Sequence, residues 1–374
     1  MKRRIIHSAL IASLLCGSSV TATNIISGID HNGWLTWTNI TPTGKHHIEW
    51  STTPTGPWNR HWTDLRDIVA TGTAHTVALP MFFRVVHQPP VAPEWVVITN
   101  AGNANDSSGF GGVSYEYVIS KYEISNDQYA EFLNNVDPGG LNLLSLYNPQ
   151  SKNDGRGGIA LNTNFPTGKR YMVKPKMGQR PVNFVSFWSA ARFCNWLHHS
   201  KSNRLHDGAY NVGPNANPAT SAISRNPGAR YWIPSENEWF KAAYYRPGTN
   251  ATYFAYPTGS SSKPALITTD SVTGEILTTP ANIANYNLGA SWGGRTGHLT
   301  LIGAAGSGSA TPFGLFDMGG NVAEWTDSFS GTNRIVRGGS WLSWDYELEK
   351  GWRVAYPAGT SIDSLGFRIA GPAP

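Results

Sequence analysis

The sequence predicts a mixed α+β protein with much irregular structure, preceded by a small all-β domain. The chain of 374 residues has 40 glycines and 12% aromatic residues but only 14% charged residues. That balance is typical of a loop-rich globular fold, because disordered chains carry more charge and fewer aromatic rings. Three helix-start signals lie among short strand-like runs, and alternating apolar and polar residues mark the segment 24–88. A chain of this length is expected to form two domains.

Residues 1–22 have the pattern of a secretory signal peptide. A basic start (KRR) is followed by an apolar run over 5–15 and by a small-residue cleavage motif that ends at Ala22. The run is too short to span a bilayer as a mature helix. The alternative is a buried N-terminal helix. We therefore expect an exported protein, periplasmic or secreted, whose mature chain has no membrane span.

Export changes the interpretation of charge and of cysteine content. Three positive charges lie in the predicted signal peptide, so the formal net charge of +5 falls to about +2 in the mature chain. No dense Lys/Arg run occurs elsewhere, and we predict no nucleic-acid partner. Cys16 leaves with the signal peptide, and Cys194 alone remains. One cysteine makes neither an internal disulfide nor a cysteine-only metal site, so Cys194 is expected to be a small buried side chain on a helix.

The mature chain is expected to divide at a proline-rich segment. Alternating runs within 24–88 (GWLTWT, HIEW and FFRVV) predict a small β domain with tryptophan in its core. The stiff linker 89–94 follows, and the second domain occupies 95–374.

Three helices are predicted in the second domain from their N-terminal signals. Ser125 and Gln128 form a capping box that begins a helix reaching about Val136. Ser186 caps a helix over about 187–198. Ser235 and Glu238 form another capping box at the start of a third helix.

The second domain resembles one known family at six motifs in a fixed order. They are YEYVISKYEISN at 115–126, RPVNFVSFWSAARFCNWL at 180–197, IPSENEW at 233–239, FGLFDMGGNVAEW at 313–325, RGGSW at 337–341 and GFR at 366–368. Together they resemble the formylglycine-generating enzyme, or sulfatase-modifying-factor, family. The resemblance implies a variant of the C-type-lectin fold that is poor in regular structure. We interpret most of the aromatic residues in these motifs as packing residues, in particular Trp188, Trp196, Trp239 and Trp325.

The resemblance also implies a calcium site in the fourth motif. By position its ligands are the side chains of Asp317 and Glu324 and the carbonyl groups of Gly320 and Val322. Carboxylates that flank a glycine-rich turn suit a hard cation such as Ca²⁺. The alternative is that Glu324 pairs with a buried arginine and that Asp317 caps a turn.

A second calcium site of the family would begin at Asn282 and the carbonyl group of Ile283. The family then expects an acidic residue about a dozen positions later. The corresponding stretch here is GGRTGH at 293–298, which contains no Asp or Glu. Loss of that charge is expected to weaken this site sharply.

The resemblance does not extend to the family's oxidase chemistry. In the oxidases two cysteines after the GGS-aromatic motif bind copper and activate oxygen. Ser343 stands at the first cysteine position here, and no cysteine follows it. Soft thiolates select Cu(I), and a serine hydroxyl does not replace them, so no copper is expected. Nor do the histidines form the helical two-His-plus-carboxylate pattern of an iron site.

The function predicted from these observations is a non-catalytic, calcium-supported binding or structural module for an exported peptide, protein or glycan. The predicted binding face, where the oxidases hold substrate, comprises Arg337, Trp341, Ser343, Trp344, Tyr346 and Arg353. An alternative for this face is that Trp341 and Arg353 belong to the core and that Trp344 alone is exposed.

Two alternative functions remain open at this stage. One is a sulfatase maturation factor or another oxidoreductase that acts by an altered mechanism. The other is that the N-terminal β domain carries the partner binding and that the second domain is a spacer.

Overall fold

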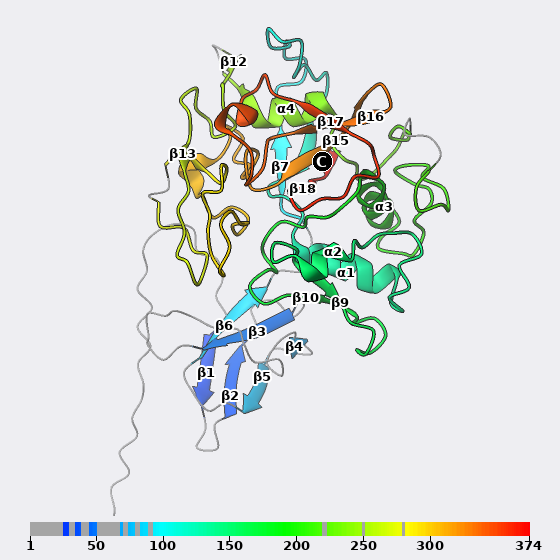
Figure 1. Ribbon diagram of the computed structural model, residues 1–374, viewed down its shortest axis with the longest axis vertical. Helices are drawn as coiled ribbons and strands as arrows, with labels where there is room; N and C mark the ends of the chain where they lie inside the picture. Colours follow the sequence, from blue (N-terminus) through cyan, green and yellow to red (C-terminus); the bar gives the residue numbers. More distant parts are fainter. Residues whose placement is uncertain are drawn as a thin grey trace, which may run out of the picture. The chain divides into compact units, whose positions relative to one another are not determined.

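The chain divides into two compact units, residues 1–90 and 91–374. The computed structural model describes residues 25–29, 34–38, 45–50, 68–69, 74–78, 83–88, 93–218, 223–248, 251–278 and 281–374 (Figure 1). The predicted signal peptide and residues 89–92 of the predicted linker lie outside the described residues.

The N-terminal unit contains two three-stranded antiparallel sheets. The first has the order β1 (Ile25–Ile29), β2 (Trp34–Thr38), β5 (Ala74–Ala78). The second has the order β4 (Ile68–Val69), β3 (Lys45–Trp50), β6 (Phe83–Gln88). In β2, Leu35 and Trp37 are buried while Thr38 is exposed. This is the alternation expected of a strand with one face on a core.

The three predicted helices of the second unit are confirmed. Helix α1 (Asn126–Val136) begins at the Ser125–Gln128 capping box, and α4 (Glu236–Tyr244) begins at the Ser235–Glu238 capping box. Helix α3 (Phe187–His198) follows Ser186, whose hydroxyl accepts the N–H of Ser189. Each cap satisfies backbone donors that a helix start leaves without intrahelical partners. The sequence did not predict the short helix α2 (Gln150–Asn153).

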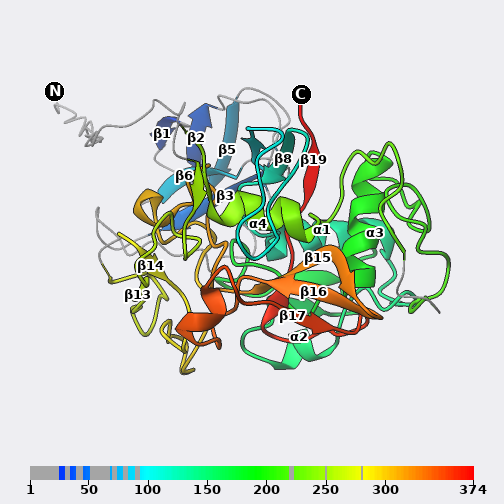
Figure 2. The ribbon, with the colours of Figure 1, turned by 90° about the horizontal axis from the view of Figure 1, so that it is seen from above.

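The largest sheet of the second unit has the order β17–β16–β15–β18. Its strands are β15 (Ala323–Ser330), β16 (Asn333–Arg337), β17 (Val354–Tyr356) and β18 (Leu365–Gly366). Pairs β15–β16 and β16–β17 are antiparallel, whereas β15 and β18 are parallel. Helix α4 packs against β15 and β16 (Figure 2).

A second sheet joins the start and the end of this unit. Strand β8 (Tyr117–Ser120) lies between β7 (Trp95–Ile98) and β19 (Ala370–Pro372), and both pairs are antiparallel. The remaining strands form short pairs: β9 (Ile159–Leu161) with β10 (Tyr171–Val173), β11 (Tyr245–Arg246) with β12 (Thr252–Tyr253), and β13 (Ala265–Leu266) with β14 (Ile283–Ala284). Few helices and many small sheets agree with the expected fold class.

The core of the second unit is built largely from aromatic rings. The four tryptophans interpreted as packing residues are all buried: Trp188, Trp196, Trp239 and Trp325. Trp325 meets Phe187 edge to face at 6.1 Å, and its indole N–H donates to the carbonyl of Val185. Cys194 is also fully buried on α3, and burial raises the pKa of its thiol. Its predicted structural role is therefore confirmed.

Buried polar groups fix the irregular segments around this core. The Glu238 carboxylate is fully buried and accepts hydrogen bonds from Tyr115, Arg225, Trp232 and the backbone N–H of Ser235. These partners come from separate segments, so this one carboxylate connects the start of α4 to irregular segments that precede it in the sequence. No helix in the described part of the chain is long and apolar enough to cross a bilayer.

Replacing this carboxylate should be costly. We expect Glu238→Ala to lower the free energy of unfolding by about 3 kcal/mol, since it leaves buried donors and a half-buried guanidinium without their acceptor. Glu94→Ala is the matched control, because its ion pair with Lys121 is largely exposed, and should cost less than about 1 kcal/mol. Urea unfolding followed by tryptophan fluorescence measures both. Equal losses in the two variants would contradict the assigned role of Glu238.

Candidate functional site

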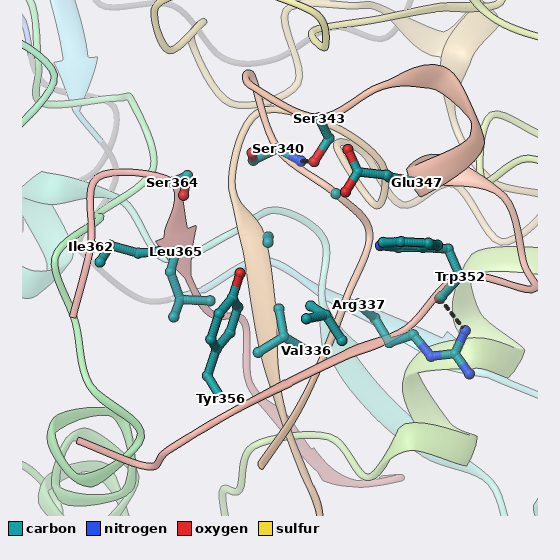
Figure 3. Close-up of a pocket in the computed structure, with 13 residues that line it drawn as sticks. Val336, Arg337, Ser340, Ser343, Glu347, Trp352, Tyr356, Ile362, Ser364 and Leu365 are labelled. Atoms are coloured by element: carbon teal, nitrogen blue, oxygen red, sulfur yellow. Dashed lines mark hydrogen bonds between the residues drawn. The ribbon is translucent and has the colours of Figure 1, made fainter. Parts of the chain in front are cut away.

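A pocket of about 80 Å³ lies over the four-stranded sheet. All four strands line it, through Ala323, Val336, Arg337, Val354, Tyr356 and Leu365. The opposite wall comes from the chain after β16 and from the segment before β18: Gly339, Ser340, Ser343, Glu347, Trp352, Ile362 and Ser364. We call this the sheet pocket. Figure 3 shows Ser343 and Glu347 at one end of it and Ile362 and Leu365 at the other.

The sheet pocket offers hydroxyl groups and one carboxylate. The Ser343 hydroxyl accepts the N–H of Ser340 at 3.1 Å, and a Glu347 carboxylate oxygen accepts the N–H of Trp344 at 2.6 Å. The hydroxyl end of Tyr356 points toward the middle of the pocket (Figure 3). None of the thirteen residues that line it is His, Cys or Lys. The lining therefore supplies no imidazole, thiolate or amine to activate a nucleophile.

The segment 342–352 carries four exposed apolar side chains, and we call it the aromatic loop. Leu342 is 54% exposed, Trp344 57%, Tyr346 50% and Trp352 36%. Tyr346 and Trp352 meet edge to face at 5.3 Å. Large apolar side chains grouped on one exposed segment are more typical of an interaction surface than isolated ones are.

Contacts beneath the aromatic loop hold it in one conformation. Leu348 is fully buried, and its carbonyl accepts the hydroxyl of Tyr244. The Lys350 ammonium lies 2.7 Å from Asp106, and the Glu349 carboxylate accepts the hydroxyl of Tyr256. The exposed rings therefore sit on a preorganised loop, which reduces the entropy lost on binding.

The predicted binding face is divided by burial. Trp344, Tyr346 and Arg353 are exposed, and Ser343 is half-buried at the pocket rim. Arg337 is 1% exposed and Trp341 3%, so these two residues support the face from inside instead of presenting their side chains to solvent. The alternative prediction is correct for Trp341 and wrong for Arg353.

One carboxylate holds both arginines of the predicted face. Glu236 accepts from Arg337 Nε at 2.8 Å and from an Nη atom of Arg353 at 2.7 Å. Arg337 also donates to the carbonyl groups of Lys350 and Trp352. Its buried guanidinium thus ties the C-terminal end of the aromatic loop to the start of α4.

The N-terminal end of this region is held by a strained dipeptide. Asn287 and Leu288 both have positive φ, at 42° and 61°. Their N–H groups donate to the carbonyl groups of Ser343 and Trp341, each at 2.8 Å. A leucine in the left-handed region is unfavourable, by about 1–3 kcal/mol, and such strain collects at functional sites.

The two carboxylates of the predicted calcium site already have protein partners. Glu324 makes a two-pronged ion pair with buried Arg368, at 2.7 Å for both contacts, and accepts the indole N–H of Trp239. Asp317 accepts the N–H of Gly303. These are the contacts of the alternative interpretation, in which Glu324 pairs with a buried arginine and Asp317 caps a turn.

A third carboxylate, which the sequence prediction missed, adds negative charge to this region. Glu123 is buried and accepts the side-chain amide of Asn321 and the N–H of Val322. Burial raises its pKa well above the usual range, and the nearby carboxylates of Asp317 and Glu324 raise it further. Burial also raises the pKa of Asp317, to about 6. Three carboxyl groups thus share one guanidinium, and a bound divalent cation would stabilise their charged forms.

These residues are nevertheless not arranged as a metal-binding cluster. No group of three or more His, Cys, Asp or Glu side chains is arranged to hold a metal ion in the described residues. The excess of buried carboxylate suits a hard cation, while the contacts of Glu324 with Arg368 already use both oxygens of one expected ligand.

The second predicted calcium site is poorly suited to a cation. The side-chain oxygen of Asn282 accepts the hydroxyl of Thr258 at 2.6 Å. Ile283 lies in the short strand pair β13–β14. Burial and the neighbouring Arg180 and Arg156 lower the pKa of His298, which ends the 293–298 stretch, to about 3. The surroundings of that stretch are therefore electropositive, which opposes binding of a second cation.

A family model for the sulfatase-modifying factor enzyme 1-like domain matches residues 111–373. The chain belongs to this family. The match covers most of the second unit and all six family motifs in full.

Solved structures that resemble the chain are distant in sequence. CarF is 21% identical over 76% of this chain and 100% of its own, with a TM-score of 0.46. PvdO from Pseudomonas aeruginosa is 18% identical over 76% of this chain and 95% of its own, with a TM-score of 0.40. Treponema denticola variable protein 1 is 17% identical over 79% and 98%, with a TM-score of 0.43. A search of curated protein sequences finds no match.

Several residues of the site lie outside the family motifs, and the sequence analysis did not predict them. Glu347, Trp352, Tyr356, Ile362 and Ser364 line the sheet pocket, yet all lie between the last two motifs. Their only sequence signal is a concentration of aromatic residues in an irregular segment, which does not tell exposed rings from buried ones.

The two arginines on Glu236 form a matched pair for testing this account. We expect Arg337→Met to lower the free energy of unfolding by about 3 kcal/mol, because Glu236 loses its buried partner and two loop carbonyls lose their donor. The same change should make the 342–352 segment more susceptible to limited proteolysis. Arg353→Met removes a partly exposed partner of the same carboxylate and should cost less than about 1 kcal/mol. Similar losses and similar proteolysis in both variants would contradict this assignment.

Proposed function

We propose that this protein is an exported, non-catalytic binding module of the sulfatase-modifying-factor family, supported by calcium, that recognises a peptide or a glycan. The observation that carries the proposal is the aromatic loop. It presents Trp344 and Tyr346 on a rigid segment beside the sheet pocket.

The chemistry of the sheet pocket supports a binding role over the family's oxidase activity. Ser343 occupies the position at which the resemblance places the first catalytic cysteine. The described part of the second unit contains one free cysteine, Cys194, which is buried within α3 and is not among the lining residues. Because a fold does not carry its chemistry with it, family membership alone does not make this chain an oxidase.

The aromatic loop supports recognition by contact. Tryptophan and tyrosine bury much apolar area at a low cost in side-chain entropy, and they are enriched among the residues that dominate binding energy. Arg353 lies next to Trp352 in the chain and is also exposed, so a charged donor accompanies the rings. The small sheet pocket behind them has room for one small group of a ligand.

Calcium enters the proposal as support for the scaffold. Asp317, Glu324 and the carbonyl groups of Gly320 and Val322 would hold it, and the adjacent Glu123 adds to the local negative charge. When bound, the cation would offset repulsion among buried carboxylates and fix the turn that precedes β15 within the 313–325 motif.

The calcium proposal predicts a metal content. We expect about one calcium per chain, with no copper or iron, by elemental analysis of the mature protein after dialysis without chelator. Asp317→Asn should lose the calcium, since it removes one ligand charge while keeping a residue type that tolerates the φ of 54° at this position. Asp270→Asn, at an exposed turn, should keep it. Near-stoichiometric copper or iron would contradict the proposal and favour a redox enzyme.

The binding proposal predicts a loss of affinity on truncating the aromatic loop. On arrays of peptides and of neutral glycans, Trp344→Ala and Tyr346→Ala should each weaken binding roughly tenfold or more, as loss of a buried aromatic anchor does. Phe165→Ala, which removes a comparably exposed ring elsewhere, should leave binding unchanged. Unchanged binding in both loop variants, or turnover of a cysteine peptide to formylglycine by the unmodified protein, would contradict it.

A further inference from the structure

We propose that a second hollow, next to the sheet pocket, binds one sugar residue of a neutral glycan. This polar hollow has a volume of about 490 Å³ and is lined by Gln150, Asn153, Asp154, Phe184, Arg295, Ile362 and Asp363. The volume falls within the range of about 300–1,000 Å³ that small-molecule sites occupy. The proposal rests on the proposed binding function and names the ligand class.

The polar hollow adjoins the sheet pocket through a shared wall. Ile362 lines both, and the segment around it contributes Asp363 to one and Ser364 to the other. The indole N–H of Trp341 donates to the carbonyl of Asp363 at 3.3 Å. One buried residue of the predicted face, Trp341, thus contacts the wall that the two hollows share.

Three exposed polar side chains of the hollow are available to a ligand. Gln150 and Asn153 lie on α2, and Arg295 lies in the 293–298 stretch; all three are exposed. None of their side chains makes a hydrogen bond or an ion pair in the described part of the chain. They converge on one open hollow, so the hollow presents amide and guanidinium donors and amide acceptors that are free to bind a ligand.

The hollow is electrically balanced. The carboxylates of Asp154 and Asp363 face the guanidinium of Arg156, whose Nη1 lies 3.9 Å and 3.7 Å from them. Asp154 Oδ1 accepts the backbone N–H of Arg156 at 2.7 Å, but the guanidinium separations exceed hydrogen-bond distance, so other oxygen lone pairs of the two carboxylates remain available. Arg295 is the positive group of the lining, while Arg156 and Lys174, whose ammonium donates to the Asp154 carbonyl, lie behind it. Cations thus accompany both carboxylates, which favours a neutral ligand over a strongly charged one.

This mixture of groups fits the hydroxyls of a sugar. A hydroxyl donates one hydrogen bond and accepts others, so it matches a lining that has carboxylate acceptors on one side and guanidinium and amide donors on another. A basic peptide would instead need carboxylates without nearby arginines, and an acidic one would meet Asp154 and Asp363. The charge balance therefore disfavours charged peptides, and the proposal commits to the glycan.

An apolar wall completes the site. Phe184 and Ile362 line the hollow, and the N–H of Phe184 donates to the carbonyl of Ile362 at 2.9 Å. Phe184 has a φ of 57°, which is rare for a bulky residue and costs about 1–3 kcal/mol. Phe184 is 6% exposed, so the apolar surface that would meet the C–H face of a sugar ring comes mainly from Ile362, with Phe184 behind it.

The second guanidinium of the site, that of Arg156, holds the polar hollow in shape. It stacks on the Trp341 ring at 4.0 Å and donates to the carbonyl groups of Gly297 and Thr296. It thereby joins the 154–156 turn, the stretch that carries Arg295 and the predicted binding face. Because these contacts engage Arg156 inside the protein, the free donors of the hollow are those of Arg295 and the α2 amides.

The test uses the full mature chain with defined probes. Saturation-transfer NMR and titration with cellotriose, maltotriose and mannotriose should detect binding of at least one neutral trisaccharide. Arg295→Ala and Asn153→Ala should each weaken that binding fivefold or more with little change in the melting temperature, since neither side chain makes a hydrogen bond or an ion pair among the described residues. Lys152→Ala is the matched control: it lies on the same helix, is exposed and does not line the hollow, and its affinity should equal that of the unmodified protein.

Three outcomes would overturn the assignment. The first is absence of binding for all three trisaccharides at millimolar concentration. The second is binding of pentalysine that Arg295→Ala strengthens, which would mean that the hollow recognises cations. The third is trisaccharide binding that Trp344→Ala abolishes while Arg295→Ala and Asn153→Ala leave it unchanged. This third result would keep the proposed binding function and reject only the polar hollow. The function itself would be rejected if the unmodified protein bound neither peptides nor glycans through the aromatic loop.

Discussion

The second unit depends on buried guanidinium groups that donate hydrogen bonds to backbone carbonyl oxygens in its irregular segments. Five arginines are fully buried: Arg180, Arg192, Arg334, Arg337 and Arg368. Each donates to backbone carbonyl groups, and Arg192 alone reaches those of Gly213, Asn215 and Ala216. A buried carbonyl without a partner is costly, and a fold with short strands leaves many of them outside regular ladders. A guanidinium has five donors in a rigid fork, so one side chain replaces several ladder bonds.

This constraint also builds the candidate site. Arg337 is buried beneath the aromatic loop and binds the carbonyl groups at its end, and Arg156 joins the polar hollow to Trp341. The outer surface of each segment is thereby left free to present side chains to a ligand. Because the two arginines donate to the backbone carbonyl groups of these segments, the aromatic rings and side-chain amides on their outer surface stay exposed.

Family membership and activity have separate physical bases in this protein. The motifs that define the family supply capping boxes, buried tryptophans and the Glu324–Arg368 pair, which are all scaffold features. The oxidase reaction needs thiolates, and the resemblance in the motifs places Ser343 at the first cysteine position. The Ser343 hydroxyl accepts the N–H of Ser340 and so helps to hold its turn, a contact that does not require sulfur. The same fold is therefore free to serve as a binding surface.

Local rules were enough to predict part of this structure. The three capped helices, the burial of Cys194 and the four packing tryptophans follow from spacing and side-chain type, which act over a few residues. Tertiary structure alone decided which residues of the predicted face are exposed, because the turn at Trp341 and Ser343 is held by Asn287 and Leu288 from a distant segment. It also decided that Arg368 would neutralise Glu324, 44 residues away. The polar hollow is assembled from residues near 150, 184, 295 and 362, and contacts between irregular segments have no periodicity from which a sequence could predict them.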